Sequence, residues 1–220
     1  MRTAIVTGAN RGIGLELCRQ LSHRGDNVVA VCRKSSPALD ALGIKIIDAI
    51  DVGDTSTMPK LIEATKGMSL DLLINNAGVL ATDTFDAFNE EGMRQQFEVN
   101  TLGPLRVTRA LIDRLNQGAR VGIVTSRMGS IADNTSGGYY GYRMSKAGVN
   151  AIGKSMSIDL RARGIAVVLL HPGFVRTEMT QGAGQIDAET SARGLLKQID
   201  ATTLENTGRF MHMSGEELPW

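Results

Sequence analysis

A tyrosine and a lysine four residues apart could carry proton transfer in this chain. Tyr142 and Lys146 share one face if the segment around them is helical, because side chains four apart lie about one turn from each other. A free phenol has a pKa of about 10, and a neighbouring ammonium favours the phenolate. The pair therefore indicates general acid and base chemistry. Ser126 ends the apolar run 121–126 just upstream, where its hydroxyl could hold a substrate oxygen.

A glycine-rich turn near the amino end is typical of a phosphate-binding site. It follows the apolar run 3–7, precedes an amphipathic segment and contains Gly8, Gly12 and Gly14. The glycines allow a sharp turn, a close approach to a pyrophosphate and tight helix packing, and a helix N-terminus offers N–H donors. A turn without any ligand is the alternative for such a motif taken alone. The same turn holds three further predicted cofactor contacts, Asn10, Arg11 and Ile13.

Two arginines favour a phosphorylated dinucleotide. Arg11 falls in the first turn of the predicted helix, where a cation meets an unfavourable dipole unless an anion is bound. Arg33 follows the second predicted strand, where an NAD site would place a carboxylate for the ribose 2′-hydroxyl, and an arginine there suits a 2′-phosphate. The alternative is that both are solvated surface charges. Their joint occurrence predicts NADP(H).

Two more strand ends should line the same edge of the sheet. Asp51 and Val52 fall at the carboxyl end of the third predicted strand, and the fourth ends in the tetrapeptide 75–78. Ligands of open α/β sheets bind at the carboxyl ends of the strands. We therefore expect cofactor contacts here, although a simple turn also explains such a tetrapeptide. The expected contacts from the tetrapeptide are Asn76, Ala77 and Gly78.

Asn100 is a candidate for supporting a proton relay. Pro104 has no N–H, so it cannot donate to the carbonyl of the residue four positions earlier, which is Asn100. A free carbonyl inside a helix attracts water, as a proton relay requires. A plain proline kink is the alternative.

Composition places these residues in one α/β domain. Among 220 residues, 42% are hydrophobic and 21% charged, and the formal net charge of +1 gives no indication of a nucleic-acid partner. No apolar run is long enough to span a bilayer, so we expect a cytoplasmic protein. Cys18 and Cys32 are expected to be packed thiols, and the three histidines lack the spacing of a metal cluster, so no metal site is predicted.

The order of patterns predicts a Rossmann-like, doubly wound, parallel sheet of seven strands. Short β-branched runs alternate with longer helical patterns, which is typical of a parallel sheet covered on both faces. The predicted strands are 3–7, 27–32, 44–48, 70–75, 120–125, 165–170 and 208–213. The predicted helical segments are 12–24, 55–66, 87–116, 140–163 and 187–199.

These motifs, in this order, resemble the short-chain dehydrogenase/reductase family, in its one-domain branch with Tyr-x3-Lys. Within that family the segment 140–146 and the ending 210–220 are similar to sniffer-type carbonyl reductases and bacterial C-factor-like proteins. The resemblance implies that Tyr142 is the acid and base, that Lys146 binds the nicotinamide ribose and lowers the tyrosine pKa, and that Ser126 orients the carbonyl. It also implies a relay water at Asn100. The implied contacts beside the nicotinamide are Pro172, Gly173, Val175 and Thr177.

The expected activity is NADP(H)-dependent interconversion of a carbonyl, in an aldehyde or ketone, and an alcohol. Two alternatives stay open. Tyr139 and Lys146 have the wider spacing that resembles enoyl reductases, and the C-factor resemblance allows a nucleotide-binding signalling protein without turnover. The substrate is a small molecule whose pocket depends on the loops 127–140 and 178–185. The resemblance also implies a homodimer, or a homotetramer, through the helices in 87–116 and 140–163.

Overall fold

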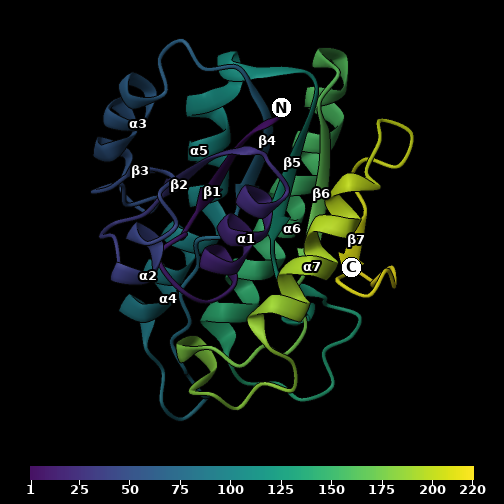
Figure 1. The fold of residues 1–220 in the computed structure, drawn as a ribbon. Helices are drawn as coiled ribbons and strands as arrows, with labels where there is room; N and C mark the ends of the chain where they lie inside the picture. Colours follow the sequence, from purple (N-terminus) through teal and green to yellow (C-terminus); the bar gives the residue numbers. More distant parts are fainter.

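A computed structural model describes all residues, 1–220, and contains one sheet of seven parallel strands (Figure 1). The strand order is β3-β2-β1-β4-β5-β6-β7, so the direction of the winding reverses between β1 and β4. The predicted fold class is confirmed. The strands are β1 (Thr3–Thr7), β2 (Asn27–Val31), β3 (Lys45–Ile47), β4 (Leu70–Asn75), β5 (Leu115–Val124), β6 (Ala166–His171) and β7 (Phe210–His212).

Helices cover both faces of the sheet. In Figure 1, α1 and α7 lie in front of the sheet, and α5 and α6 lie behind it. The α-helices are α1 (Gly12–His23), α2 (Pro37–Asp40), α3 (Met58–Ala64), α4 (Glu90–Gln96), α5 (Gly103–Leu111), α6 (Tyr140–Asp159) and α7 (Ala188–Asp200). Two buried apolar clusters of 19 residues each fill the layers, one beneath α1 and α7 and the other beneath α3, α5 and α6.

The predicted helix 87–116 is wrong as a single element. The structure divides it into α4, a π-helix over Phe97–Leu102, α5 and a 3-10 turn over Ile112–Arg114. In the π-helix the Gly103 N–H donates to the Glu98 carbonyl, five residues earlier. The widened turn ends at Leu102, two residues before Pro104, which has no N–H to donate and lies in the first turn of α5.

Strand β5 also begins earlier than predicted. Its pairing with β4 shifts register between Leu70 and Leu72, and Gly118 has a φ of +87° within the irregular stretch. An irregularity of this kind hides the alternating pattern by which a strand is recognised. The helix α2 was missed because only four residues form it, capped by the Ser36 side chain.

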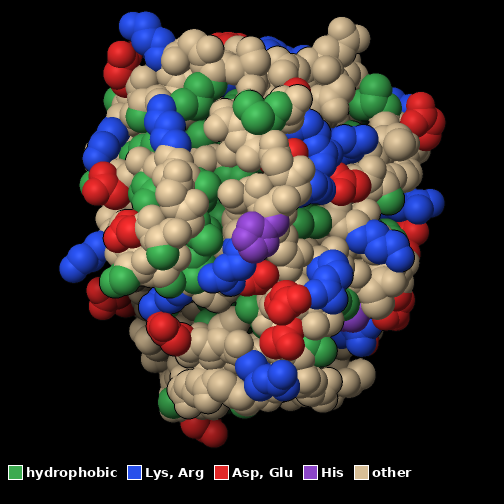
Figure 2. Space-filling view, viewed as in Figure 1, with side chains coloured by type: hydrophobic (Ala, Val, Ile, Leu, Met, Phe, Trp, Pro, Cys, Tyr) green, Lys and Arg blue, Asp and Glu red, His purple; other side chains and the backbone are tan.

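The outer surface over α1 and α7 mixes both signs of charge (Figure 2). Arg24 and Arg2 both pair with Asp200, at 2.7 and 2.9 Å, and both also pair with Asp26. These contacts connect the start of β1, the end of α1 and the end of α7. None of the helices combines the length and the apolar composition that a membrane-spanning segment requires.

The long connections after β4, β5 and β6 gather at the lower end of Figure 1. They follow the carboxyl ends of these strands, the edge at which open parallel sheets bind ligands. The winding direction reverses between β1 and β4, so the connections that follow these two strands run to opposite sides of the sheet. A crevice forms between the two connections. The residues that could do chemistry should therefore meet at this edge.

Candidate active site

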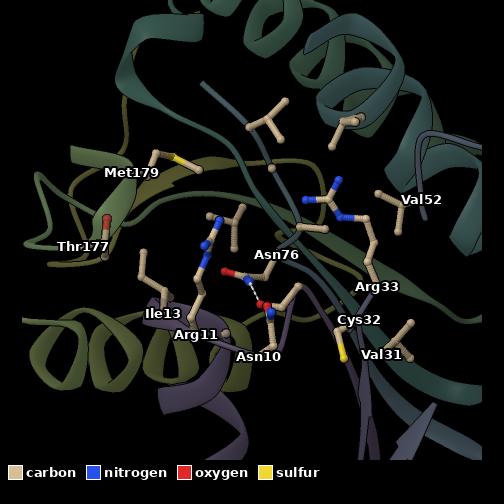
Figure 3. Close-up of a pocket in the computed structure, with 18 of the residues that line it drawn as sticks. Asn10, Arg11, Ile13, Val31, Cys32, Arg33, Val52, Asn76, Thr177 and Met179 are labelled. Atoms are coloured by element: carbon tan, nitrogen blue, oxygen red, sulfur yellow. Dashed lines mark hydrogen bonds between the residues drawn. The ribbon is translucent and has the colours of Figure 1, made fainter. Parts of the chain in front are cut away.

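A cavity of about 560 Å³ opens at the carboxyl edge of the sheet. A volume of this size falls within the range for cofactor and ligand pockets. In Figure 3, Arg33 lies at one end and Thr177 and Met179 lie at the other, with Asn76 between them. The predicted contacts that line the cavity are Gly8, Asn10, Arg11, Gly12, Ile13, Gly14, Arg33, Asp51, Val52, Asn76, Ala77, Gly78, Tyr142, Lys146, Pro172 and Thr177.

The glycine turn has the close approaches that its sequence predicts. Gly8 has a φ of +65°, and a Cβ there would lie 2.7 Å from the Ala77 Cα. A Cβ on Gly14 would lie 2.2 Å from the Gly8 carbonyl oxygen. The Asn76 amide donates to the carbonyls of Thr7 and Gly8, at 3.0 and 3.2 Å. The turn after β1 is therefore locked against the end of β4, and larger residues cannot replace these glycines without moving it.

Two other glycines keep the cavity open. A Cβ on Gly78 would stand 3.3 Å from the Asn100 Oδ1 and 3.7 Å from the Lys146 Nζ, in the space in front of both groups. Gly12 has a φ of +53°, and its Cβ would meet the Thr177 side chain at 3.4 Å. Both positions are bare backbone that a flat or phosphorylated ligand can approach.

The two arginines each face a carboxylate. Arg11 pairs with Glu178 at 2.6 Å, and Arg33 lies 3.9 Å from Asp51. The Glu178 carboxylate lies beside the start of α1. It can therefore offset the unfavourable position of Arg11 in the helix dipole without a bound ligand. Both arginine side chains are 64% exposed, so their guanidinium groups can turn towards a ligand in the cavity.

Helix α6 carries the predicted tyrosine and lysine. The Lys146 Nζ lies 5.7 Å from the centre of the Tyr142 ring and donates a hydrogen bond to the Val124 carbonyl at 3.0 Å. Both residues line the cavity. Lys146 is only 4% exposed. Lysines are rarely buried to this extent unless their ammonium group has a polar partner.

The pKa of Tyr142 is shifted in the direction opposite to the one expected from the sequence. Burial raises the pKa of Tyr142 to about 12, and the nearby Ser126 hydroxyl acts in the opposite direction. Burial also lowers the pKa of Lys146 to about 8. Loss of water disfavours each charged form, and the sequence pattern carries no measure of that burial.

Ser126 lies where β5 ends. It is 8% exposed, and its hydroxyl accepts from the Met128 N–H at 3.2 Å, which starts a 3-10 turn over Arg127–Gly129. That turn packs on α6 because Gly129 has no side chain: a Cβ there would lie 2.7 Å from the Lys146 carbonyl carbon. The contact brings the end of β5 against the helix of Tyr142.

Asn100 is fully enclosed between three elements. Its side-chain oxygen accepts from the Val79 N–H at 2.8 Å, and its amide donates to the Val79 carbonyl at 2.8 Å and to the Ser145 hydroxyl at 3.0 Å. The residue thus joins the π-helix to the segment after β4 and to α6. Asn100 lies in a π-helix and not in the regular helix that the sequence argument assumed, and a hydrated carbonyl at this residue stays a prediction.

Two predicted contacts, Gly173 and Val175, do not line the cavity. Val175 is 3% exposed and bridges to Ile186, and a Cβ on Gly173 would collide with Ile186 at 2.8 Å. Sequence reasoning missed several lining residues at strand ends and in the segment after β6. They are Val31, Cys32, Lys34, Ile50, Val79, Val99, Val124, Thr125, Glu178 and Met179. Most are the immediate chain neighbours, on one side or the other, of a predicted site residue, so strand-end position was the available signal.

Comparisons with known proteins agree with this geometry. The model of the short chain dehydrogenase family matches residues 2–187. The 1-hydroxy-2-glutathionyl-2-methyl-3-butene dehydrogenase of Rhodococcus sp. (strain AD45) is 43% identical over 226 residues, covering 100% of both chains. The C-signal protein of Myxococcus xanthus is 49% identical over 154 residues, covering 69% of this chain and 93% of that protein. The chain therefore belongs to the short-chain dehydrogenase/reductase family of oxidoreductases.

Solved structures extend the similarity to the whole fold. The carbonyl reductase Sniffer of D. melanogaster superposes with a TM-score of 0.91 at 29% identity and covers 100% of both chains. The NADPH-bound carbonyl reductase from chicken fatty liver gives a TM-score of 0.90 at 29% identity, covering 100% of this chain and 99% of that one. The resemblance to Sniffer-type and C-factor-like proteins is confirmed.

Proposed function

We propose that this protein is an NADP(H)-dependent oxidoreductase that interconverts an aldehyde or ketone and an alcohol, with Tyr142 as the proton donor. The observation that carries the proposal is that Tyr142 and Lys146 both line the cavity, one turn apart on α6, with Ser126 packed beside them. The similarity to two carbonyl reductases over the full chain supports the same reaction.

Each group has a distinct task in this reaction. NADPH, when bound, supplies the hydride. Ser126 donates to the substrate carbonyl oxygen and holds it beside the phenol. Tyr142 gives its proton to that oxygen as the alcohol forms, which leaves a phenolate. The charge of Lys146 stabilises that phenolate, and Asn100 fixes the segment after β4 against α6.

The cavity suits NADP(H). The bare backbone at Gly12 and Gly78 leaves room for a dinucleotide, and the N–H groups at the start of α1, which no side chain caps, favour an anion. Arg33 would hold the 2′-phosphate at the far end of the cavity, and Lys146 would meet the nicotinamide ribose at the other. The NADPH bound in the chicken relative supports this assignment.

Arg33→Asp should remove the preference for NADPH over NADH. The change replaces a guanidinium that can pair with the 2′-phosphate by a carboxylate that repels it, so the affinity for NADPH should fall about tenfold or more while that for NADH is kept. Fluorescence titration with each cofactor measures both constants. Arg193→Asp is the matched control, because Arg193 is an exposed arginine of α7 that does not line the cavity. Equal affinities of the unmodified protein for the two cofactors would contradict the assignment.

Tyr139 is the weaker candidate for the proton donor. It is the N-cap of α6, has a left-handed conformation with a φ of 52° and does not line the cavity. Its side chain is 39% exposed. This placement favours carbonyl reduction by Tyr142 over reduction of a carbon–carbon double bond by Tyr139.

A signalling role without turnover is the second candidate, and the similarity to C-signal favours it. A panel of aldehydes and ketones, followed by loss of NADPH absorbance and by identification of the alcohol, separates the two. We expect turnover on part of the panel. NADPH binding without alcohol from any carbonyl would leave the signalling role.

A further inference from the structure

The catalytic helix is capped by a residue from a distant segment. Tyr139, the N-cap of α6, contributes no side-chain hydrogen bond to the first turn. Asp83, in the segment after β4, takes that place. One of its carboxylate oxygens accepts from the Tyr140 N–H at 2.5 Å and the other from the Gly141 N–H at 3.0 Å. Its own carbonyl accepts from the Tyr139 N–H at 3.0 Å.

The carboxylate is buried and tightly enclosed. Asp83 is 4% exposed, so its charge depends on the two N–H donors and on the positive end of the α6 dipole. A Cβ on Gly141 would lie 3.0 Å from the Asp83 Oδ2 and 2.6 Å from the Gln96 Nε2. The Gln96 side chain in turn accepts from the Ala81 N–H at 3.0 Å. The first turn of α6 therefore has little freedom to shift against this segment.

The same segment forms part of the cavity wall. It starts at Gly78 and Val79, which line the cavity, and Asn100 holds it through both polar groups of Val79. It then runs to Asp83, which holds the turn that contains Tyr142. One short piece of chain thus connects the cofactor side of the cavity to the position of the phenol.

We propose that Asp83 is a positioning residue that sets the phenol of Tyr142 against the substrate oxygen. This inference rests on the proposed function, in which Tyr142 donates the proton. Asp83 acts through the backbone of Tyr140 and Gly141 and touches no reacting atom. A displacement of the first turn by about 1 Å is enough to lower a rate strongly, because proton and hydride transfer both require aligned atoms.

Substitutions at Asp83 should lower kcat in proportion to the hydrogen-bond acceptors that they remove. Aspartate offers two acceptors to two N–H groups, asparagine offers one, and alanine offers none. The value of kcat should be highest in the unmodified protein, lower in Asp83→Asn and lowest in Asp83→Ala, with a loss of about tenfold or more for alanine. The NADPH dissociation constant should stay within about twofold, because the turn at Gly8 and the Arg33 contact do not depend on α6.

Asp187→Asn and Asp187→Ala are the matched controls. Asp187 likewise caps a helix through its carboxylate: it is the N-cap of α7 and accepts from the Thr190 N–H at 2.7 Å. These variants should lower the melting temperature without changing kcat. Asp83→Asn keeps the side-chain volume and serves as the folded variant if alanine prevents folding. An unchanged kcat in Asp83→Asn and Asp83→Ala, or equal losses of kcat and NADPH affinity, would overturn the proposal.

Hydrogen exchange provides a readout that does not need turnover. The amides of Tyr140 and Gly141 should exchange faster in Asp83→Asn than in the unmodified protein, and Asp187→Asn should leave them unchanged. Slow exchange of both amides in Asp83→Asn would overturn the capping role. If the unmodified protein reduces no carbonyl, the proposed function fails, and the exchange rates still decide whether Asp83 fixes this turn.

Discussion

Tyr142→Phe is expected to lower the rate of carbonyl reduction by a factor on the order of 10² or more. The substitution removes only the hydroxyl, so the ring keeps its packing on α6 while the substrate oxygen loses its proton donor. NADPH should bind nearly as tightly as before, because the aromatic ring and Lys146 stay in place. Steady-state kinetics and a cofactor titration on the same preparation measure the two effects.

Tyr139→Phe is the matched control for this prediction. The same hydroxyl is removed three residues earlier on the chain, from a side chain that is 39% exposed and does not line the cavity. Its kcat should stay within about twofold of the unmodified protein. The reverse pattern, with turnover kept in Tyr142→Phe and abolished in Tyr139→Phe, would contradict the assignment and favour an enoyl reductase.

Lys146→Met should strongly slow carbonyl reduction and at the same time stabilise the protein at neutral pH. Burial lowers the pKa of Lys146 from 10.5 to about 8, so the charged form is disfavoured in the fold by about 3 kcal/mol. The lost hydrogen bond to Val124 offsets part of this gain, by about 1–2 kcal/mol. We expect a melting temperature that is higher by a few degrees and reduction that is slower by a factor on the order of 10².

The stability that Lys146→Met gains over the unmodified protein should decrease as pH rises. Below pH 8 Lys146 is protonated in both the folded and the unfolded chain, and the full cost of its buried charge is present. Between about 8 and 10.5 the folded chain releases the proton first, so the unmodified protein gains stability relative to Lys146→Met as pH rises. Melting curves of both proteins from pH 7 to about pH 11 should show the gain of Lys146→Met shrink and then reverse, because only the lost hydrogen bond to Val124 remains at high pH.

Lys154→Met is the control for the lysine prediction. Lys154 lies on the same helix, and its side chain is exposed, so its removal should produce neither the pH-dependent gain nor the loss of activity. A destabilised Lys146→Met protein at pH 7, or a difference in melting temperature that does not change with pH, would contradict the buried ammonium.

Reduction by the unmodified protein should also become slower as pH rises through about 8. Lys146 loses its charge there, whereas Tyr142, with a pKa raised to about 12, still holds its proton. The loss of the ammonium removes the group that stabilises the phenolate formed by proton transfer. The titrating group in this range is therefore the lysine, in contrast to the tyrosine titration expected from the sequence.

The sequence predicted the parts of the site that depend on local spacing. Tyr142 and Lys146 were found because four residues make one helical turn, and the glycine turn was found because it joins an apolar strand to an amphipathic helix. The seven strands were found for a similar reason, since buried parallel strands are short apolar runs. Position at a strand end was enough to place Asp51, Asn76 and Ser126 at one edge.

The remaining features depend on contacts between distant segments. Asp83 accepts a hydrogen bond from the N–H of Tyr140, which is 57 positions away in the chain. Nothing in the sequence around Asp83 indicates that the two residues meet. Glu178 is 167 positions from its partner Arg11. The pKa of Tyr142 was predicted in the wrong direction because spacing shows a neighbouring charge but not the exclusion of water. The π-helix before Pro104 likewise required the packing of α4 and α5 to be known.

The most direct test of the central claim follows a deuterium label from the cofactor to the product. Purified protein is supplied with NADPH deuterated at the transferred position and with a carbonyl that passes the activity screen, and the product is examined by mass spectrometry and NMR. We predict an alcohol with one deuterium on the carbinol carbon and one NADP⁺ formed per alcohol. Deuterium on the β carbon of an α,β-unsaturated substrate whose carbonyl stays intact, or NADPH binding with no labelled product from any substrate, would contradict carbonyl reduction by this protein.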